Sequence, residues 1–149
     1  MNDPKKTGRA EGVRAGGSYE ALEGLRVLVV DDDPVVRMLV RQILKRVRSV
    51  VETASSGVDA LDLLEREPFD LVVTDIEMPG IDGIALARFV RNPRSNVRSH
   101  DLPILALTAL GGEEMRARCM DAGMNEFIVK PIRVRELLGA IRRHAPKGR

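Results

Sequence analysis

Short apolar runs alternate with stretches of helical periodicity along most of this chain, and this alternation limits the folds that it can adopt. The first run, Arg26–Val30, is rich in β-branched residues and stops at three consecutive aspartates. Four similar runs follow, at residues 49–53, 70–74, 103–107 and 126–129. The connections leave room for helices but not for hairpins, which is typical of parallel strands. The sequence therefore predicts an α/β fold: a doubly wound, five-stranded parallel sheet with five helices on its two faces.

Capping residues and apolar periodicity locate the helices. Asp33 followed by Pro34 predicts an N-cap and a first helical residue, and Gly123 predicts the end of the fourth helix. The outer side of the first helix carries Arg37, Arg41 and Lys45, which form either a docking face or a solvated face. Its inner stripe is predicted to consist of Val36, Leu39, Val40, Ile43, Leu44 and Val47.

The length and composition indicate one globular domain. The chain has 149 residues, of which 44% are hydrophobic and 31% charged. Residues 1–23 have almost nothing to bury, which predicts a disordered lead-in. The domain itself is expected over residues 24–145, with a tail over residues 146–149.

The distribution of charge excludes several functions. The net charge of +2 combines an acidic body, with 14 basic and 18 acidic residues over 23–130, and a basic end, with 6 and 1 over 131–149. An acidic body with four aromatic residues lacks the basic stripe and stacking platform of a nucleic-acid-binding protein. No apolar run is long enough for a membrane helix or a signal peptide, and the single cysteine, Cys119, excludes an internal disulfide. These features predict a cytoplasmic protein that binds neither nucleic acid nor membrane.

Polar residues follow the predicted strands at their carboxyl ends, where open parallel sheets bind ligands. They are Asp31 and Asp32 after the first strand, Asp75 after the third, Thr108 after the fourth and Lys130 after the fifth. A cluster of carboxylates without histidine or cysteine suits Mg²⁺ or Mn²⁺. A metal, an ammonium and a hydroxyl facing one carboxylate are the groups needed to transfer a phosphoryl group onto it, and Asp75 is the central candidate.

Four segments in this order resemble the receiver (phosphoacceptor) domain of bacterial two-component response regulators, including the chemotaxis receiver and the receivers of hybrid kinases. They are VLVVDDDPVVR, DLVVTDIEMPGIDG, PILALTA and FIVKPI, and the resemblance covers about residues 24–145. It implies a flavodoxin-like fold with strand order 2-1-3-4-5. It also implies a cis peptide bond between Lys130 and Pro131.

The resemblance assigns expected roles to individual residues. Asp75 corresponds to the phosphorylated aspartate. Thr108 and Lys130 correspond to the switch hydroxyl and the phosphate-binding lysine, and Phe127 occupies the switch position where the family often has tyrosine. The metal ligands are expected to be Asp32 directly, Asp31 largely through water, Asp75, and the backbone carbonyl of Glu77.

The function implied is that of a single-domain regulator in a phosphorelay, which is no enzyme beyond its own phosphorylation and dephosphorylation. Its expected partners are a sensor histidine kinase or a histidine-containing phosphotransfer protein, and a downstream target protein. The short tail predicts that no output domain follows, and both a stand-alone regulator and a receiver fragment of a hybrid sensor kinase fit this expectation. Met1 and the predicted lead-in favour the stand-alone regulator.

Two other classes stay open at this point. One is an unphosphorylated interaction module with a receiver-like fold, although such modules usually lose one of the site residues. The other is a haloacid dehalogenase-like phosphatase, because Asp31-x-Asp33 imitates its first motif. That reading would leave Asp75 without a role, and Glu136 is the sole acidic residue after Lys130.

Overall fold

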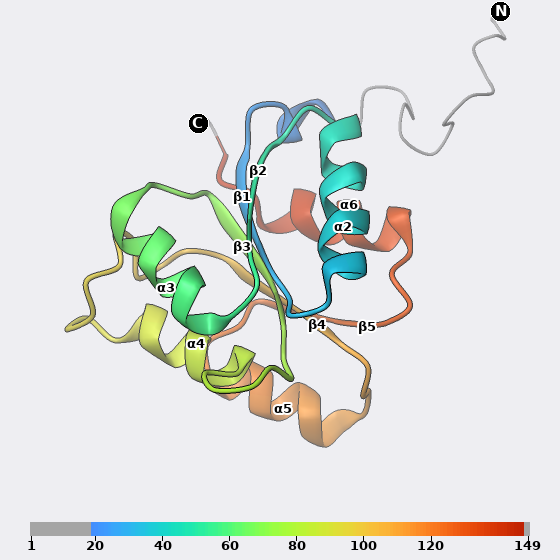
Figure 1. Cartoon of the computed structure of the whole chain (residues 1–149). Helices are drawn as coiled ribbons and strands as arrows, with labels where there is room; N and C mark the ends of the chain where they lie inside the picture. The colour runs from blue at the N-terminus through green and yellow to red at the C-terminus, as the bar shows by residue number, and fades with distance from the viewer. Residues whose placement is uncertain (1–18, 148–149) are drawn as a thin grey trace, which may run out of the picture.

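The computed structural model describes residues 19–147 and contains a five-stranded parallel sheet (Figure 1). The strand order is β2-β1-β3-β4-β5, and every neighbouring pair is parallel. This result confirms the predicted fold class and strand order. The strands are β1 (Arg26–Val30), β2 (Val50–Ala54), β3 (Leu71–Asp75), β4 (Ile104–Thr108) and β5 (Glu126–Val129).

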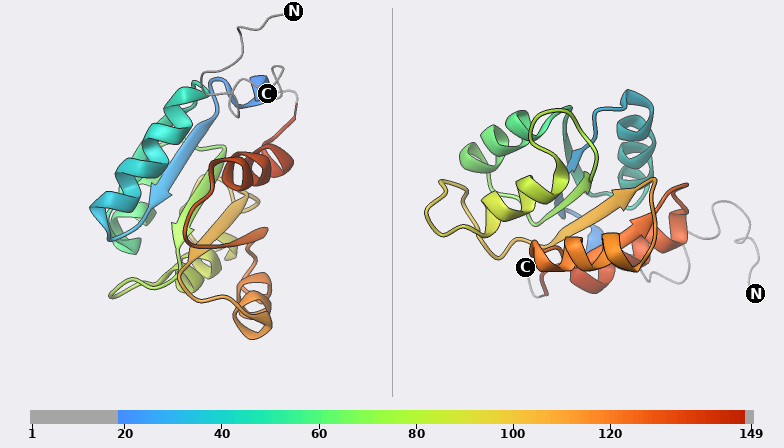
Figure 2. Two further views of the ribbon diagram at one scale, coloured as in Figure 1. Left: turned by 90° about the vertical axis from the view of Figure 1, so that its right-hand side faces the viewer. Right: turned by 90° about the horizontal axis from the view of Figure 1, so that it is seen from below.

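The helices cover both faces of the sheet. Figures 1 and 2 show α2 and α6 on one face and α3, α4 and α5 on the other. The longest, α2, has 13 residues, and no helix within residues 19–147 is long and apolar enough to cross a membrane. The helices are α2 (Pro34–Arg46), α3 (Gly57–Arg66), α4 (Gly83–Arg91), α5 (Glu113–Asp121) and α6 (Val134–His144), preceded by the short 3₁₀ helix η2 (Glu20–Leu22).

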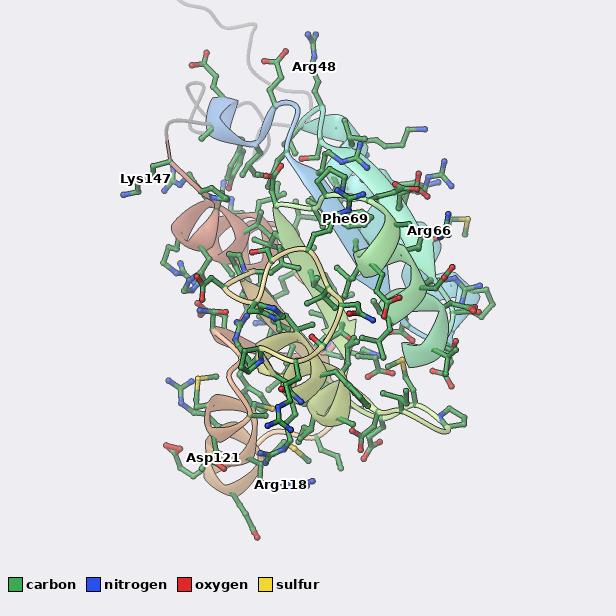
Figure 3. All side chains as sticks on the ribbon, turned by 90° about the vertical axis from the view of Figure 1, so that its left-hand side faces the viewer. Arg48, Arg66, Phe69, Arg118, Asp121 and Lys147 are labelled. Atoms are coloured by element: carbon green, nitrogen blue, oxygen red, sulfur yellow. The ribbon has the colours of Figure 1, made fainter. Side chains whose placement is uncertain are left out.

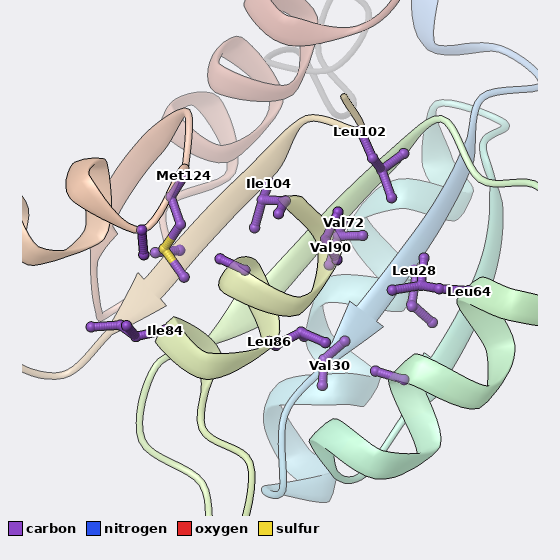
Figure 4. Packing of buried hydrophobic residues seen from close by; sticks show 14 of the residues in the cluster. Leu28, Val30, Leu64, Val72, Ile84, Leu86, Val90, Leu102, Ile104 and Met124 are labelled. Atoms are coloured by element: carbon purple, nitrogen blue, oxygen red, sulfur yellow. The ribbon is translucent and has the colours of Figure 1, made fainter. Parts of the chain in front are cut away.

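Side-chain alternation along β1 builds two cores. Val27 and Val29 pack with the residues of α2 and α6, whereas Leu28 and Val30 pack with those of α3, α4 and α5 (Figure 4). All four side chains are at most 1% exposed. A strand that is buried on both faces must be apolar throughout, which explains why the run before Asp31 contains no polar residue after Arg26.

Side-chain caps start most of the helices next to the sheet. Asp33 accepts a hydrogen bond from the Val35 amide at 2.9 Å, which confirms the cap that the Asp33-Pro34 pair predicts. Ser56 and Asp82 cap α3 and α4 in the same way. In contrast, α5 starts at Gly112 without a side-chain cap.

Helix α5 is also the most weakly buried of the helices. Cys119 is its one buried residue, and its charged residues face solvent. Figure 3 shows Arg118 and Asp121 on α5 at one end of the molecule, with Arg48 and Lys147 at the opposite end. Helix α5 therefore contributes fewer buried side chains to the core than α2, α3, α4 or α6.

Two predictions need correction. The domain begins earlier than residue 24, because Tyr19–Glu23 fold onto it and Leu22 is fully buried beside α2 and α6. The carbonyl of Leu22 accepts a hydrogen bond from the Ser49 hydroxyl at 2.8 Å, which ties this segment to the start of β2. In α2, Leu39 is 42% exposed rather than part of the inner stripe. Residues 1–18 of the predicted lead-in and residues 148–149 of the tail lie outside the described part of the chain.

Candidate functional site

The candidate site lies at the carboxyl edge of the sheet. Asp75 is the last residue of β3, the central strand, and it is paired in register with Leu107 of β4. Asp31 directly follows β1 on one side of β3. Thr108 ends β4 and Lys130 follows β5 on the other side. The parallel arrangement thus brings residues that are distant in sequence to one edge.

Three carboxylates meet at this edge. One oxygen of each of Asp31, Asp32 and Asp75 lies within 4.8 Å of the others. Asp31 and Asp75 are buried, with 1% and 7% of their surface exposed, whereas Asp32 is exposed. The cluster is therefore closed on its protein side and open to solvent beside Asp32.

Lys130 supplies a positive charge that two of these carboxylates share. Its Nζ lies 3.2 Å from Oδ2 of Asp31 and 3.6 Å from Oδ1 of Asp75. Burial opposes the charge of this lysine, but the two carboxylates outweigh burial and raise its pKa. The Lys130–Pro131 peptide bond is cis, as predicted.

Asp75 is in an electrostatically unfavourable environment. Burial and the negative charge of Asp31 raise the pKa of Asp75 to about 6, although Lys130 and the backbone amides of Glu77 and Ile76 oppose the shift. One ammonium therefore does not fully balance the carboxylates. A further cation at this edge would favour the ionised form of Asp75.

The carboxylate cluster fits a hard divalent cation. Its donors are all oxygens, which Mg²⁺ and Mn²⁺ prefer, and the exposure of Asp32 leaves an open side for water or phosphate ligands. The two histidines are engaged elsewhere: His100 contacts the carbonyl of Val90, and His144 contacts Glu126.

The predicted switch residues occupy different environments. The Thr108 side chain is fully buried, and its hydroxyl donates to the Leu110 carbonyl at 3.1 Å and accepts from the Leu110 amide at 3.0 Å. Phe127 is partly buried and packs against the core beneath α3, α4 and α5. Glu77 is exposed, and its amide faces Asp75.

Close backbone packing fixes the loop that follows Asp75. The Gly83 amide donates to the Ile76 carbonyl at 2.8 Å, and a Cβ atom at Gly83 would lie 2.2 Å from the carbonyl oxygen of Asp75. A Cβ atom at Gly57 would similarly lie 2.5 Å from the carbonyl oxygen of Ile81. Glycine at both positions lets the starts of α3 and α4 enclose this loop.

Sequence reasoning missed one residue that contacts the site. The helical pattern places Arg37 on the outer side of α2, but its Nη1 donates to the backbone carbonyl of Asp31 at 2.7 Å. Long side chains on a helix lean toward its N-terminus, so an arginine in the first turn can cover the preceding turn. That lean is the one signal in the sequence that points to this contact.

Comparison of the sequence and comparison of the structure with known proteins point to the same protein family. Residues 27–142 match the family described as the response regulator receiver domain. The chain is 41% identical over 118 residues to the response regulator MprA of Mycobacterium sp. (strain KMS), covering 79% of this chain and 49% of that protein. It thus spans about half the length of this relative.

Solved structures of two bacterial proteins are similar in fold. The chemotaxis protein CheY4 of Vibrio cholerae has a TM-score of 0.74 and 30% identity, over 80% of this chain and 98% of that one. The receiver domain of the sensor histidine kinase PA1611 of Pseudomonas aeruginosa PAO1 has a TM-score of 0.72 and 30% identity, over 81% and 97%. That structure holds a magnesium ion in its active-site cleft.

Proposed function

The chain belongs to the response regulator receiver domain family, and from this premise we propose that it accepts a phosphoryl group on Asp75. One observation carries the proposal: the carboxylate of Asp75 ends the central strand, 3.6 Å from the ammonium of Lys130 and beside the carboxylates of Asp31 and Asp32. This places a nucleophile, a positive charge and a set of metal ligands around one point. The alternative, a haloacid dehalogenase-like phosphatase, would leave Asp75 without a role, and it is not needed to explain the position of these residues.

The proposed reaction is nucleophilic attack on phosphorus. An ionised oxygen of Asp75 forms a bond to the phosphorus of a phosphohistidine, the phosphorus–nitrogen bond breaks, and the imidazole leaves with the electron pair and takes up a proton. Lys130 pairs with a phosphoryl oxygen and stabilises its negative charge. When bound, Mg²⁺ or Mn²⁺ supplies further charge neutralisation at the phosphoryl oxygens. Its ligands would be the carboxylates of Asp31, Asp32 and Asp75 and the backbone carbonyl of Glu77.

The new acyl phosphate would act as a switch. To donate a hydrogen bond to a phosphoryl oxygen, the Thr108 hydroxyl must leave the carbonyl of Leu110. That rotation alters the loop between β4 and α5, which leads into an uncapped helix, and the packing next to Phe127. The surface formed by α5, β5 and α6 would then change its affinity for a downstream protein.

The proposal also defines the partners and the setting. The phosphoryl donor is a histidine kinase or a histidine-containing phosphotransfer protein, and both a stand-alone regulator and a receiver within a longer protein are compatible with the similarity. We place the reaction in the cytoplasm, the compartment that the sequence predicts.

Intact-mass measurement after incubation with Mg²⁺ and acetyl phosphate tests the proposal. The wild-type protein should gain about 80 Da, the mass of one phosphoryl group. Asp75→Asn should show no gain, whereas Asp62→Asn, which alters an exposed carboxylate on α3, should behave like the wild type. An unmodified wild-type protein, or an adduct that persists in Asp75→Asn, would overturn the proposal.

A further inference from the structure

We propose that Arg37 is a positioning residue for the cation site, because it holds the turn after β1 through the backbone carbonyl of Asp31. The inference rests on the proposed function, in that it takes the carboxylate cluster as the place where a divalent cation binds. In this inference Arg37 is not itself a metal ligand. The contact itself is a hydrogen bond of 2.7 Å from Nη1 of Arg37.

The position of the accepting carbonyl explains why a side chain is needed there. Val30 is the last residue of β1 that pairs with β2 and β3, so the carbonyl of Asp31 lies beyond the strand ladder. Asp31 itself is 1% exposed, and a backbone carbonyl at a buried position needs a donor. Arg37 supplies it from the first turn of α2.

Arg37 completes a set of contacts that hold Asp31 at four atoms. The Asp31 amide donates to the Ala54 carbonyl at 3.2 Å, and the Asp33 amide donates to Oδ1 of Asp31 at 2.9 Å. Lys130 lies 3.2 Å from Oδ2. The fourth contact, from Arg37, is the one that acts on the peptide group that joins Asp31 to Asp32.

Planarity of that peptide group transmits the effect to Asp32. The Asp31 carbonyl and the Asp32 amide lie in one plane, so a carbonyl held in place also fixes the plane from which the Asp32 backbone continues. Asp32 is exposed, and one of its carboxylate oxygens lies within 4.8 Å of oxygens of Asp31 and Asp75. A fixed plane limits the directions in which this side chain leaves the backbone, and so favours that position of the carboxylate. Arg37 thereby pre-organises a ligand that it does not touch.

The charge of Arg37 provides a discriminating feature. A guanidinium beside the cluster repels a divalent cation, so a residue acting through charge alone would weaken cation binding, and its removal would tighten it. A residue acting through position has the opposite effect on removal. The sign of the change in affinity therefore separates the two roles.

The test compares Arg37→Met with Arg41→Met, a matched variant in which an exposed arginine one turn along α2 is removed. Mn²⁺ affinity is measured by electron paramagnetic resonance of the free ion, with folding checked by circular dichroism. Arg37→Met should raise the Kd about tenfold, as for other residues that orient metal ligands, whereas Arg41→Met should stay within about twofold of the wild type. Arg37→Lys, which retains a donor, should lie between them.

A second readout requires no metal. In EDTA, hydrogen exchange of the Asp32 and Asp33 amides should be faster in Arg37→Met than in Arg41→Met, because the turn after β1 has lost the hydrogen bond from Arg37. Should Arg37→Met fail to fold, Arg37→Gln replaces it in both measurements. An unchanged or lower Kd in the folded variant would overturn the inference, even if its thermal stability fell.

The two proposals fail in different ways. If the wild-type protein takes no phosphoryl group while Arg37→Met still weakens Mn²⁺ binding, the proposed function is wrong and the role of Arg37 stands. If the wild type is phosphorylated on Asp75 and Arg37→Met binds Mn²⁺ as tightly as the wild type, the inference about Arg37 is wrong and the proposed function stands.

Discussion

Both edges of the sheet hold charged groups that are wholly or partly buried, but the partners of these groups differ. At the amino edge, the guanidinium of Arg91 donates to the carbonyl oxygens of Gly123 (2.7 and 3.0 Å) and His100 (2.7 Å) and to the amide oxygen of Asn125 (3.0 Å). At the carboxyl edge, three carboxylates face the single ammonium of Lys130. The amino edge therefore links chain segments through neutral hydrogen-bond acceptors. The carboxyl edge has more negative than positive charge.

Burial has opposite consequences at the two edges. It lowers the pKa of Arg91, a shift that the charge of Asp101 partly opposes, but arginine stays charged at every physiological pH. At Asp75, burial and Asp31 raise the pKa to about 6, close to the physiological range. The hydrogen bonds of Arg91 to neutral oxygens therefore persist at every physiological pH. The contacts among the carboxylates around Asp75 change when a proton or a cation binds.

Substitution of Gly83 should disturb the carboxyl edge most. In Gly83→Ala the new Cβ atom would meet the Asp75 carbonyl oxygen at 2.2 Å, and backbone atoms cannot move aside as a flexible side chain can. We expect a loss of about 3 kcal/mol or more in the free energy of unfolding, measured by urea denaturation. Gly139→Ala is the control, because its Cβ atom would meet only the end of Arg143 at 3.6 Å and should be neutral or slightly stabilising. Equal effects of the two substitutions would contradict the close packing at Gly83.

Removal of Arg91 should damage the amino edge while sparing the other. Arg91→Met leaves the carbonyls of Gly123 and His100 without this donor and should cost about 2–3 kcal/mol in the free energy of unfolding. The exposed Arg88, which forms one ion pair of 3.7 Å with Asp121, provides the control Arg88→Met. Mn²⁺ affinity of the folded Arg91→Met protein should match that of the wild type. A large change in affinity would show that the two edges are not independent.

The pH dependence of stability should reveal the imbalance at Asp75. Its pKa in the folded protein, about 6, lies above the ordinary value of 3.8, so the unfolded chain loses this proton first as the pH rises. The contribution of Asp75 is most favourable below pH 4, becomes less favourable between about pH 4 and 6, and stays so above pH 6.

Asp75→Asn removes this cost. In EDTA at pH 7, we expect the variant to be more stable than the wild type by about 1–2 kcal/mol, and the difference should shrink toward pH 4. Chemical denaturation at several pH values measures both. Parallel profiles for the two proteins would show that Asp75 carries no such cost.

Addition of cation should have the smallest effect. At a Mg²⁺ concentration about ten times its Kd, binding to the folded state should stabilise the wild type by about 1.4 kcal/mol, measured by urea denaturation with and without the ion. Asp32→Asn should lose most of this gain, whereas Arg91→Met, although less stable, should keep it. A gain that survives in Asp32→Asn would place the cation elsewhere.

Much of this architecture is predictable because its causes are local. Strands buried on both faces must be continuously apolar, and the Asp33-Pro34 pair carries its own capping signal. Strand ends are harder: β2, β3 and β4 each begin and end one residue later than expected, because the hydrogen bonds that define a strand depend on its neighbour in the sheet. Leu22 escapes prediction because one leucine among polar residues shows no periodicity, although the core made by α2 and α6 covers it.

The position of the site residues at strand ends makes them predictable, but their partners are not. The lean of helical side chains toward the N-terminus indicates only the direction of Arg37, and the contact with the Asp31 carbonyl also depends on how far a flexible side chain reaches. The bonds between the Thr108 hydroxyl and the backbone of Leu110 depend in the same way on the path of one loop. Tertiary geometry decides both.

Lys130 and Asp31 lie far apart along the chain, so the site can form only after nearly the whole chain has been synthesised. Their hydrogen bond of 3.2 Å spans 99 positions, and Lys130 follows the last strand to leave the ribosome. A chain truncated before β5 would lack both Lys130 and the residues of β5 and α6 that complete one core, so neither the ammonium nor the full sheet would hold Asp31 and Asp75. Under the proposed function, such a chain would lack the ammonium that stabilises the incoming phosphoryl group, so only a completely synthesised chain would be phosphorylated.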